Sequence, residues 1–409
     1  MMNSTTMYTS SASHQKRPNW ALTISRFLVG CLFIFSGLIK ANDPKGFGYK
    51  LEEYFKVFNL SMLDEYSTWI AIVICAFEII LGALLLLGLA RNKVSWGLLL
   101  LTIFFTFLTF YSAFFEVVSS CGCFGDAIPL TPWQSFLKDL VLLGLILIIV
   151  RFRHQIKPLI KSRFSNNLLT ILIIIVSFGA GIYTMNFLPI IDFLPYREGN
   201  NLPQQMEIPE DAEPDVYEHI YTLKNKSTGE SKTVSDEVYM NEKIWEDENW
   251  EIIGDPKSTL IKKGFEPAIA DLIISDAEGN DVTQEILTNP YFNFVVVSTD
   301  VTKLSSVDLL ALDRINTTIR EVSEDYPIRA VLLTASSSQN VNFINDQLNL
   351  VLESFNADLV PLKSMVRSNP GVMLMQNGTV IKKWSKHTFP SKEHLESQFL
   401  NKQFTPTAN

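Results

Sequence analysis

Long apolar runs dominate the first half of the chain, and five of them are long enough to cross a membrane. A hydrocarbon core of roughly 30 Å takes about 20 helical residues. The runs cover approximately Trp20–Ile39, Ser67–Ala90, Val94–Val118, Trp133–Val150 and Leu168–Pro189. Because only helices or closed barrels satisfy the backbone in lipid, the pattern predicts a membrane bundle of four helices followed by a fifth transmembrane helix.

Polar and charged positions divide the apolar runs into segments. Residues 1–19 form a polar tail, and the first run lacks a small-residue cleavage site, so we expect a retained anchor. Residues 20–151 then form the four-helix bundle, residues 152–167 a basic loop, and residues 168–189 the fifth membrane helix. From about Glu198 onward the chain has the composition of a soluble domain.

Lysine and arginine gather in alternate loops, which predicts the orientation of the bundle. They precede the first run, follow the second, and separate the fourth from the fifth: Lys16, Arg17, Arg91, Lys93, Arg151, Arg153, Lys157, Lys161 and Arg163. By the positive-inside rule these sites face the cytoplasm. We therefore expect a cytoplasmic N-terminus, with the loops 41–66 and 119–132 and the whole soluble part outside.

Composition and charge narrow the choice of partners. The chain is 47% hydrophobic and has a formal net charge of −9. Phosphate binding needs a basic stripe, whereas the basic residues here lie at helix ends, so we expect a lipid bilayer and no nucleic acid as partner. The cysteines, Cys31, Cys75, Cys121 and Cys123, all precede the soluble part, which excludes a disulfide-stapled secreted fold.

Charged residues inside the apolar runs are candidates for function. An ionised Glu78 in the second run costs about 2.5–3.5 kcal/mol to insert, so it must be protonated, paired or facing a polar cavity. Arg26 in the first run is the nearest candidate partner, and the pair is either a proton or ligand site or a structural ion pair. Lys138 and Asp139 occupy the outer turn of the fourth run, where their side chains can reach water.

A short amphipathic helix is predicted in the first outer loop. Leu51, Tyr54, Phe55 and Phe58 recur at helical spacing. This helix either lies on the outer membrane surface or packs against the bundle.

The outer loop between the third and fourth runs carries the sharpest motif, Ser119-Ser120-Cys121-Gly122-Cys123-Phe124-Gly125-Asp126. A bond between cysteines two residues apart needs a kinked backbone, which Gly122 permits. So small a ring adds little stability, and its strain raises the reduction potential. Disulfide exchange competes here with an inert packed loop and with half a metal site. No histidine or further cysteine stands at ligand spacing, so we expect no metal.

Several residues give the membrane part its resemblance to a known family. They are Arg26, Ser36, Gly37, Lys40, Asp43, Pro44 and Gly46, then Glu78, Gly82 and Gly88, and finally the motif from Cys121 to Gly125. Over about residues 20–150 this pattern resembles the DoxX and MauE-like redox-associated membrane proteins, in the larger form found in Bacteroidota. The resemblance implies a bacterial inner membrane, a periplasmic outer side and a role in disulfide maturation. Methylamine utilisation comes with it as a family label.

The soluble half alternates strands and helices after Asn289. The pattern predicts a strand Phe292–Ser298, a helix Ser305–Val322, a strand Arg329–Ala335, a helix Val341–Phe355, a strand Asp358–Pro361, then a hairpin around Asn377-Gly378 and a final helix. Parallel strands joined by helices require this order. Residues 289–409 thus resemble a thioredoxin-like α/β domain, in which Pro370 matches the cis-proline beside the active site. Residues 190–288 are a linker with a small β-containing region, including strands Asp215–Thr222 and Ser231–Met240.

The thioredoxin-like part lacks the reactive pair of that fold. Ser298 to Thr302 stand where a Cys-x-x-Cys follows the first strand, and the soluble half holds no cysteine. The domain therefore cannot exchange disulfides by itself. It either docks a partner or faces the cysteine loop, or it is a degenerate domain kept for packing.

Two functional hypotheses follow from the sequence. In the first, Cys121 and Cys123 are catalytic and pass electrons between a periplasmic thiol or disulfide client and a membrane carrier such as a quinone. The chain would then be a thiol-disulfide/quinone oxidoreductase, supported by Glu78, Arg26 and Lys40, with Asp126 and Pro370 as further candidates. In the second, the chain is a non-catalytic membrane assembly or docking factor. A transporter built on Glu78 is disfavoured because the runs show no inverted repeat.

Overall fold

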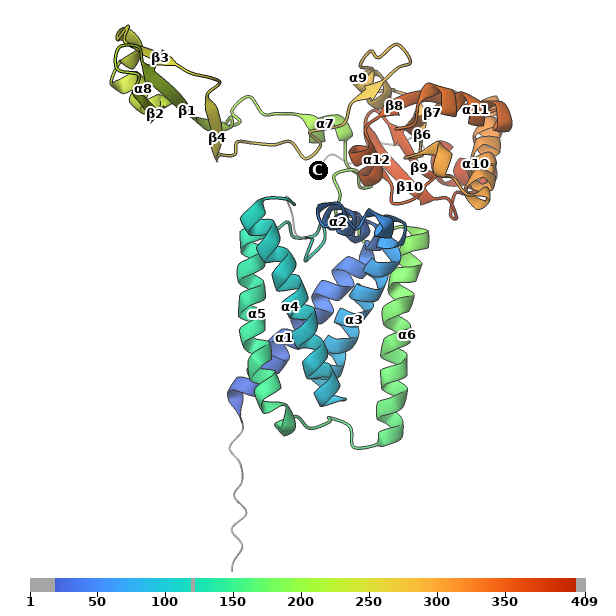
Figure 1. Ribbon diagram of the computed structural model, residues 1–409. Coiled ribbons are helices and arrows are strands. Elements are labelled where there is room, and N and C mark those ends of the chain that lie inside the picture. The colour runs from blue at the N-terminus through green and yellow to red at the C-terminus, as the bar shows by residue number, and fades with distance from the viewer. Residues whose placement is uncertain (1–18, 119–121, 402–409) are drawn as a thin grey trace, which may run out of the picture.

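The computed structural model describes residues 19–118 and 122–401. Its membrane part consists of α1 (Trp20–Asn42), α3 (Ser67–Leu87), α4 (Arg91–Phe115), α5 (Pro132–Phe152) and α6 (Arg163–Phe187). These helices stand side by side, with α6 on one flank, and the soluble parts lie beyond one end of them (Figure 1). We call this end the domain-facing end. The basic loop between α5 and α6 lies at the opposite end.

Four helices in the described part of the chain are long and apolar enough to cross a membrane. They are α1, α4, α6 and the stretch Ser61–Leu87, which joins the 3-10 turn η1 (Ser61–Tyr66) to α3. The helix predicted over Trp133–Val150 does form as α5, and it runs alongside α4 over the same height (Figure 1). It is not among the four, so its crossing stays a prediction.

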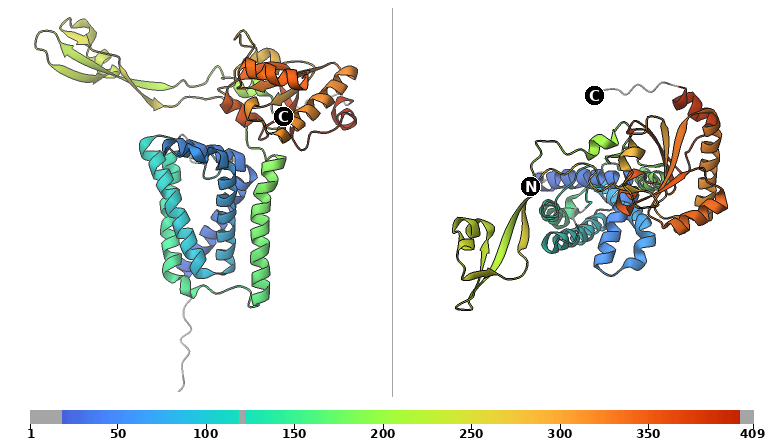
Figure 2. Two further views of the ribbon diagram at one scale, coloured as in Figure 1. Left: turned by 45° about the vertical axis from the view of Figure 1, so that its right-hand side comes forward. Right: turned by 90° about the horizontal axis from the view of Figure 1, so that it is seen from above.

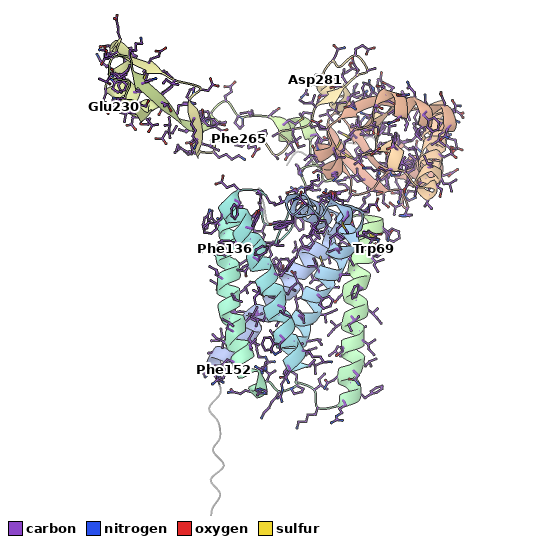
Figure 3. The ribbon with its side chains drawn as sticks, viewed as in Figure 1. Trp69, Phe136, Phe152, Glu230, Phe265 and Asp281 are labelled. Carbon is purple, nitrogen blue, oxygen red and sulfur yellow. The ribbon has the colours of Figure 1, made fainter. Side chains whose placement is uncertain are left out.

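The outer faces of the helices are apolar, as contact with lipid requires. Phe27, Phe77 and Leu100 are among many large hydrophobic side chains that stay exposed on the bundle surface. In Figure 3, Trp69 and Phe136 lie towards the domain-facing end and Phe152 lies at the opposite end. Aromatic residues at both ends of a span are typical of the two membrane interfaces. The chain is therefore a membrane protein.

Glycines set the close packing of α1 on α3. A Cβ added at Gly82 would lie 2.8 Å from the carbonyl oxygen of Gly30, and one added at Gly37 would lie 2.9 Å from that of Cys75. Small residues let helix backbones approach in this way inside a membrane. The contacts fix the register of the two helices and place Glu78 beside Gly37, near the domain-facing end of α1.

The amphipathic helix of the first loop is α2 (Pro44–Val57), and it lies across the domain-facing end of the bundle (Figure 2). Its side chains Phe47, Leu51 and Tyr54 are each at most 5% exposed. Phe47 and Leu51 share a hydrophobic cluster with α3. Of the two expected arrangements, the structure shows packing against the bundle.

A polar joint connects α6 to the end of α1. The Thr184 hydroxyl donates to the carbonyl oxygen of Ala41. The Asn42 side-chain oxygen accepts from the backbone N–H groups of Ile190 and Ile191, at 3.0 Å each, and its amide donates to the Ile191 carbonyl. These bonds fix where the chain leaves the membrane part and enters the soluble part.

The thioredoxin-like domain is built on a six-stranded sheet of order β10-β9-β6-β7-β8-β5. The strands are β5 (Ile274–Ser275), β6 (Phe292–Val297), β7 (Ile328–Thr334), β8 (Glu353–Ala357), β9 (Gly371–Gln376) and β10 (Thr379–Ser385). Strands β6, β7 and β8 are parallel, and β9 is antiparallel to β6. Alternate side chains of β6 enter two separate cores, one on each face. The helices are α9 (Thr283–Leu287), α10 (Ser306–Asp325), α11 (Ser338–Leu348), α12 (Leu359–Met365) and α13 (Lys392–Leu395).

Most predicted elements of this domain are confirmed, but the end of one helix and the type of one element were wrong. The helix expected to reach Phe355 ends at Leu348, because Asn349 adopts the left-handed conformation with φ 49°. Strand β8 follows, and the strand expected at Asp358–Pro361 is helix α12 instead. Proline is tolerated in the first turn of a helix, where its missing N–H has no partner to lose. The hairpin turn has φ 47° at Asn377 and 79° at Gly378, as predicted.

A separate sheet forms a side lobe that projects away from the bundle and the thioredoxin-like domain (Figure 1). It contains β1 (Val216–Asn225), β2 (Ser231–Ser235), β3 (Trp250–Ile252) and β4 (Lys257–Lys262). Glu230 and Phe265 mark its two ends in Figure 3. The second strand predicted here stops at Ser235, because the Ser235 hydroxyl caps helix α8 (Asp236–Asn241). The linker joins the lobe to the thioredoxin-like domain through the short helix α7 (Leu202–Met206).

We expect Gly82→Ala to lower the thermal unfolding midpoint of the detergent-solubilised protein, because its Cβ would overlap the backbone of α1. Overpacking of this kind costs about 1–3 kcal/mol. The matched control is Gly144→Ala in α5, where a Cβ meets no atom within 4 Å. Equal midpoints for the two variants would contradict the proposed close packing of α1 on α3.

Candidate redox site at the domain-facing end of the bundle

Cys123 lies in a tight loop between α4 and α5. Its side chain is buried, and its carbonyl oxygen accepts a hydrogen bond of 2.9 Å from the Ser36 hydroxyl on α1. Gly122 has φ +66°, a backbone conformation that residues with a side chain rarely adopt. The Gly125 N–H donates a hydrogen bond to the Gly122 carbonyl oxygen and so closes the turn. Cys121 lies outside the described residues, so the expected cysteine pair stays a prediction.

Cys123 borders a cavity inside the bundle. The cavity has a volume of about 370 Å³. Its lining comes from α1, α3, α4, α5 and the cysteine loop: Leu32, Phe33, Ser36, Lys40, Glu78, Thr102, Phe105, Cys123, Lys138, Asp139 and Leu142. The cysteine thus shares one partly open cavity with two lysines and two carboxylates.

A buried ion pair forms one wall of this cavity. Lys40 Nζ lies 2.5 Å from Glu78 Oε1, and the two side chains are 2% and 4% exposed. The ammonium also lies 5.0 Å from the ring centre of Phe47 and 4.8 Å from that of Phe105. Aromatic faces attract a cation most strongly where water is excluded. Lys40 is therefore held by one carboxylate oxygen and two rings.

The partner expected for Glu78 was wrong, because Lys40 takes the place predicted for Arg26. The Arg26 guanidinium instead donates to the carbonyl oxygens of Leu85 and Leu86, at 3.0 and 3.2 Å. The reason is the register of α1 on α3, which puts Glu78 opposite Gly37. Arg26 lies about three helical turns, or roughly 17 Å, from that level.

A second charged pair lines the cavity from α5. Lys138 Nζ lies 2.5 Å from Asp139 Oδ1, while the Thr109 hydroxyl of α4 donates to Asp139 Oδ2 at 3.1 Å. Asp139 is only 2% exposed. The expectation that both side chains reach towards water therefore fails for Asp139, which turns inward between α4 and α5.

Arg367 docks the thioredoxin-like domain onto the bundle. Its Nε lies 2.7 Å from Asp43 Oδ2 and its Nη2 lies 3.1 Å from Asp126 Oδ2. Lys45 Nζ donates to the Arg367 carbonyl oxygen at 2.9 Å, and Lys363 Nζ lies 3.0 Å from Glu52 Oε2. The Arg367 side chain is 6% exposed. The predicted candidate Asp126 is thus a docking residue that lies three positions after Cys123.

The protonation of this interface follows from its burial. Burial raises the pKa of Tyr49 to about 12, and its ring lies under Lys363 Nζ at 4.0 Å. Burial lowers the pKa of Lys45 to about 8, helped by the positive charge of Lys386. The pKa of Arg367 is raised, because the attraction of Asp43 and Asp126 outweighs the effect of burial.

The edge of the domain that faces the bundle corresponds to a thioredoxin active site without its cysteines. The Asn369–Pro370 peptide bond is cis, as predicted for Pro370. Asn369 Oδ1 accepts from the Ser298 hydroxyl at 3.0 Å and from the Thr299 N–H at 3.2 Å. An open cleft of about 1780 Å³ separates this edge from α2 and η1. Hydroxyls therefore occupy the place of thiols.

Comparison with known proteins supports the membrane half of the prediction. Residues 18–152 match the family model described as methylamine utilisation protein MauE. The helical bundle is MauE-like. Protein TlpB of Flavobacterium psychrophilum is 29% identical over 126 residues, which are 30% of this chain and 34% of that protein. The chain thus covers about a third of this relative, and no solved structure is significantly similar. Together the similarities support a membrane redox-associated protein.

The sequence missed two parts of this site. Arg367 was not singled out, because one arginine in a loop gives no signal of the carboxylates it will meet more than 200 residues away in the chain. Thr102 was missed because a threonine in a membrane helix usually bonds to its own backbone. Among the described residues, neither the MauE-like bundle nor the soluble part brings together three or more His, Cys, Asp or Glu side chains that could hold a metal ion.

We expect Arg367→Met to undock the thioredoxin-like domain, because it leaves Asp43 and Asp126 without their cation. Loss of one partner of a buried polar contact costs about 1–3 kcal/mol. Limited proteolysis of the linker after α6 would detect this as faster cleavage. The control is Lys382→Met, which removes an exposed ion pair with Glu198. Equal cleavage rates in the two variants would show that Arg367 does not hold the domain.

Lys45 makes the free energy of unfolding depend on pH in a defined direction. Its pKa is about 8 in the folded protein and about 10.5 in the unfolded chain. Between these values the unfolded chain binds a proton that the folded chain has released, so the contribution of Lys45 to the free energy of unfolding rises with pH. We expect the unfolding midpoint of the wild type, minus that of Lys45→Met, to be larger at pH 10 than at pH 7. A difference independent of pH would contradict a lowered pKa.

Proposed function

We propose that the protein transfers two electrons from the thiols of a client protein to a lipid-soluble carrier, with Cys121 and Cys123 as the reactive pair. The observation that carries the proposal is the position of Cys123 on the wall of a charged cavity, at the end of the bundle where the soluble domain docks. Cys121 is proposed as the second reactive cysteine from the sequence alone, because only Gly122 separates it from Cys123.

The proposed cycle balances electrons and protons. A client dithiol attacks the Cys121–Cys123 disulfide, so that one S–S bond breaks in the protein and one forms in the client. The two protein thiols are then reoxidised by a quinone, which takes two electrons and two protons and leaves as a quinol. Strain in so small a disulfide ring favours its reduction by a client, as the first step requires.

The surroundings of Cys123 suit thiolate chemistry. The Lys40 ammonium borders the same cavity, and a nearby cation favours a thiolate, the nucleophilic form of cysteine. The loop lies at the level where the aromatic side chains of α4 and α5 cluster, with the rings of Phe114 and Trp133 4.9 Å apart. A carrier that diffuses in the bilayer reaches this depth.

We further propose that the membrane is a bacterial inner membrane and that the domain-facing end is periplasmic. Disulfides persist on that side, and the basic loops lie at the other end of the bundle. The thioredoxin-like domain would then hold the client near the cysteine loop. Its cleft beside Thr299 and Asn369 is polar and opens towards α2.

The same cleft favours a second candidate function. A domain that carries hydroxyls in place of thiols can hold a client without reacting with it, so the chain would act as a membrane assembly factor. This alternative requires the cleft and the docking residue Arg367, and it does not require the cysteines.

The double variant Cys121→Ser, Cys123→Ser separates the two functions. We expect it to fold and dock normally but to lose dithiol-dependent quinone reduction in membranes, because no exchangeable pair remains. The control is Cys31→Ser, which changes a cysteine on the outer face of α1. Thiol trapping in intact cells should also show the pair oxidised during respiration and reduced without it. Unchanged activity in the double variant would leave the assembly function standing.

A further inference from the structure

Two buried polar atoms in the bundle cavity have no hydrogen-bond partner in the part of the chain that the structure describes. Glu78 Oε2 and Thr102 Oγ1 are both inaccessible and make no hydrogen bond among the described residues, and both residues line the cavity below Cys123. An unmade hydrogen bond of this kind costs about 1–3 kcal/mol. Native proteins usually avoid the cost by holding a water at such a place.

The free space in the cavity matches water. The 370 Å³ of the cavity includes space open to the outside, and only a small part of it admits a water molecule. A single water needs about 10–15 Å³ of such volume, together with two to four polar partners. Ser36, Lys138 and Asp139 add polar groups around the same space. The cavity therefore has room for about two waters.

We propose that this cavity is a hydrated proton-transfer site in which Glu78 Oε2 receives, through water, the proton that the Cys123 thiol releases when the cysteine pair is reoxidised. The inference rests on the proposed function, which supplies the reoxidation and its quinone. The net reaction is unchanged, because Glu78 only holds the proton until it passes to the reduced carrier.

The charges around Glu78 explain why moving the proton from Cys123 to Glu78 costs little free energy. The titratable groups near Glu78 come from several neighbouring elements. They are Lys40 of α1, Cys75 of α3, Cys123 of the loop, and Lys138 and Asp139 of α5. The described residues of α4 that line the cavity, Thr102 and Phe105, carry no charge. When the proton moves, Glu78 becomes neutral and Cys123 becomes a thiolate, so Lys40 exchanges one anionic partner for another. The total charge of the cavity stays constant, which avoids the cost of a new charge in low dielectric.

The alternative role for Glu78 is purely structural, as the counterion of Lys40. Glu78→Gln alone does not separate the roles, because it leaves a buried lysine uncompensated. The double variant Lys40→Met, Glu78→Met removes both charges and retains apolar volume, so it keeps the helices together under either role. Thr102→Val tests the water separately, since it removes one polar contact and no charge.

The experiment measures how fast the reduced, full-length protein in lipid nanodiscs is reoxidised by a short-chain quinone. General acid–base groups typically contribute about 10²–10⁴-fold to a rate, so we expect the Lys40→Met, Glu78→Met variant to be at least 100-fold slower than the wild type. Its rate should also rise with pH, because bulk base must take the proton, while the wild-type rate stays nearly flat. Thr102→Val should be slower in the same direction, and because it leaves Lys40 in place, this slowing does not come from losing the cation that favours the thiolate. A wild-type rate in Thr102→Val would assign the effect of the double variant to Lys40 and overturn the water-mediated proton site. Glu116→Gln, an acid-to-amide change at the exposed end of α4, is the control and should match the wild type.

The outcomes separate this inference from the function on which it rests. If the variant lacking Cys121 and Cys123 still reduces quinone, the electron-transfer function and the proton site both fail. If the cysteines are required but the Lys40→Met, Glu78→Met variant reoxidises at the wild-type rate with a flat pH profile, only the proton site is overturned and Glu78 is a structural counterion. An unfolding midpoint close to that of the wild type confirms that the variant is folded.

Discussion

One buried arginine forms two ion pairs between the two halves of this protein. Arg367 comes from the loop before the cis-proline and ends between Asp43, which begins α2, and Asp126, which follows the cysteine loop. A guanidinium suits this position because its fork of donors can serve two carboxylates at once. The contact turns the cysteine-free edge of the thioredoxin-like domain towards the bundle. The cleft, the loop and the cavity are therefore parts of one region.

Buried charges inside the bundle also pair with opposite charges, and there the need for a partner is stronger. Lipid supplies no water to a charged group, so each ionised side chain must find its partner within the protein. The glycine contacts between α1 and α3 bring Lys40 to Glu78, and the α4–α5 contact brings Thr109 to Asp139. Close backbone packing thus decides which charges meet. The two ion pairs, Lys40–Glu78 and Lys138–Asp139, line one polar cavity in an otherwise apolar bundle.

The sequence predicts the architecture better than it predicts the site. Apolar runs, the alternation of strands and helices, and the Asn377-Gly378 turn are local patterns. The membrane helices, the α/β fold of the soluble part and the hairpin predicted from them are confirmed. The partner of Glu78 depends on helix register, which no local pattern contains, and so Arg26 was chosen where Lys40 is correct. Arg367 is a contact across more than 200 residues, and only the folded chain shows it.

The joint at Asn42 has a consequence for the order in which the protein is built. Asn42 binds the backbone of Ile190 and Ile191, so the exit of the chain from α6 is anchored on α1, a helix that is made before α6. Because synthesis proceeds from the N-terminus, the bundle can assemble before the thioredoxin-like domain leaves the ribosome. The thioredoxin-like domain then docks onto a surface that already presents Asp43 and Asp126. A ribosome that stalled before Arg367 would release a chain with that surface uncovered.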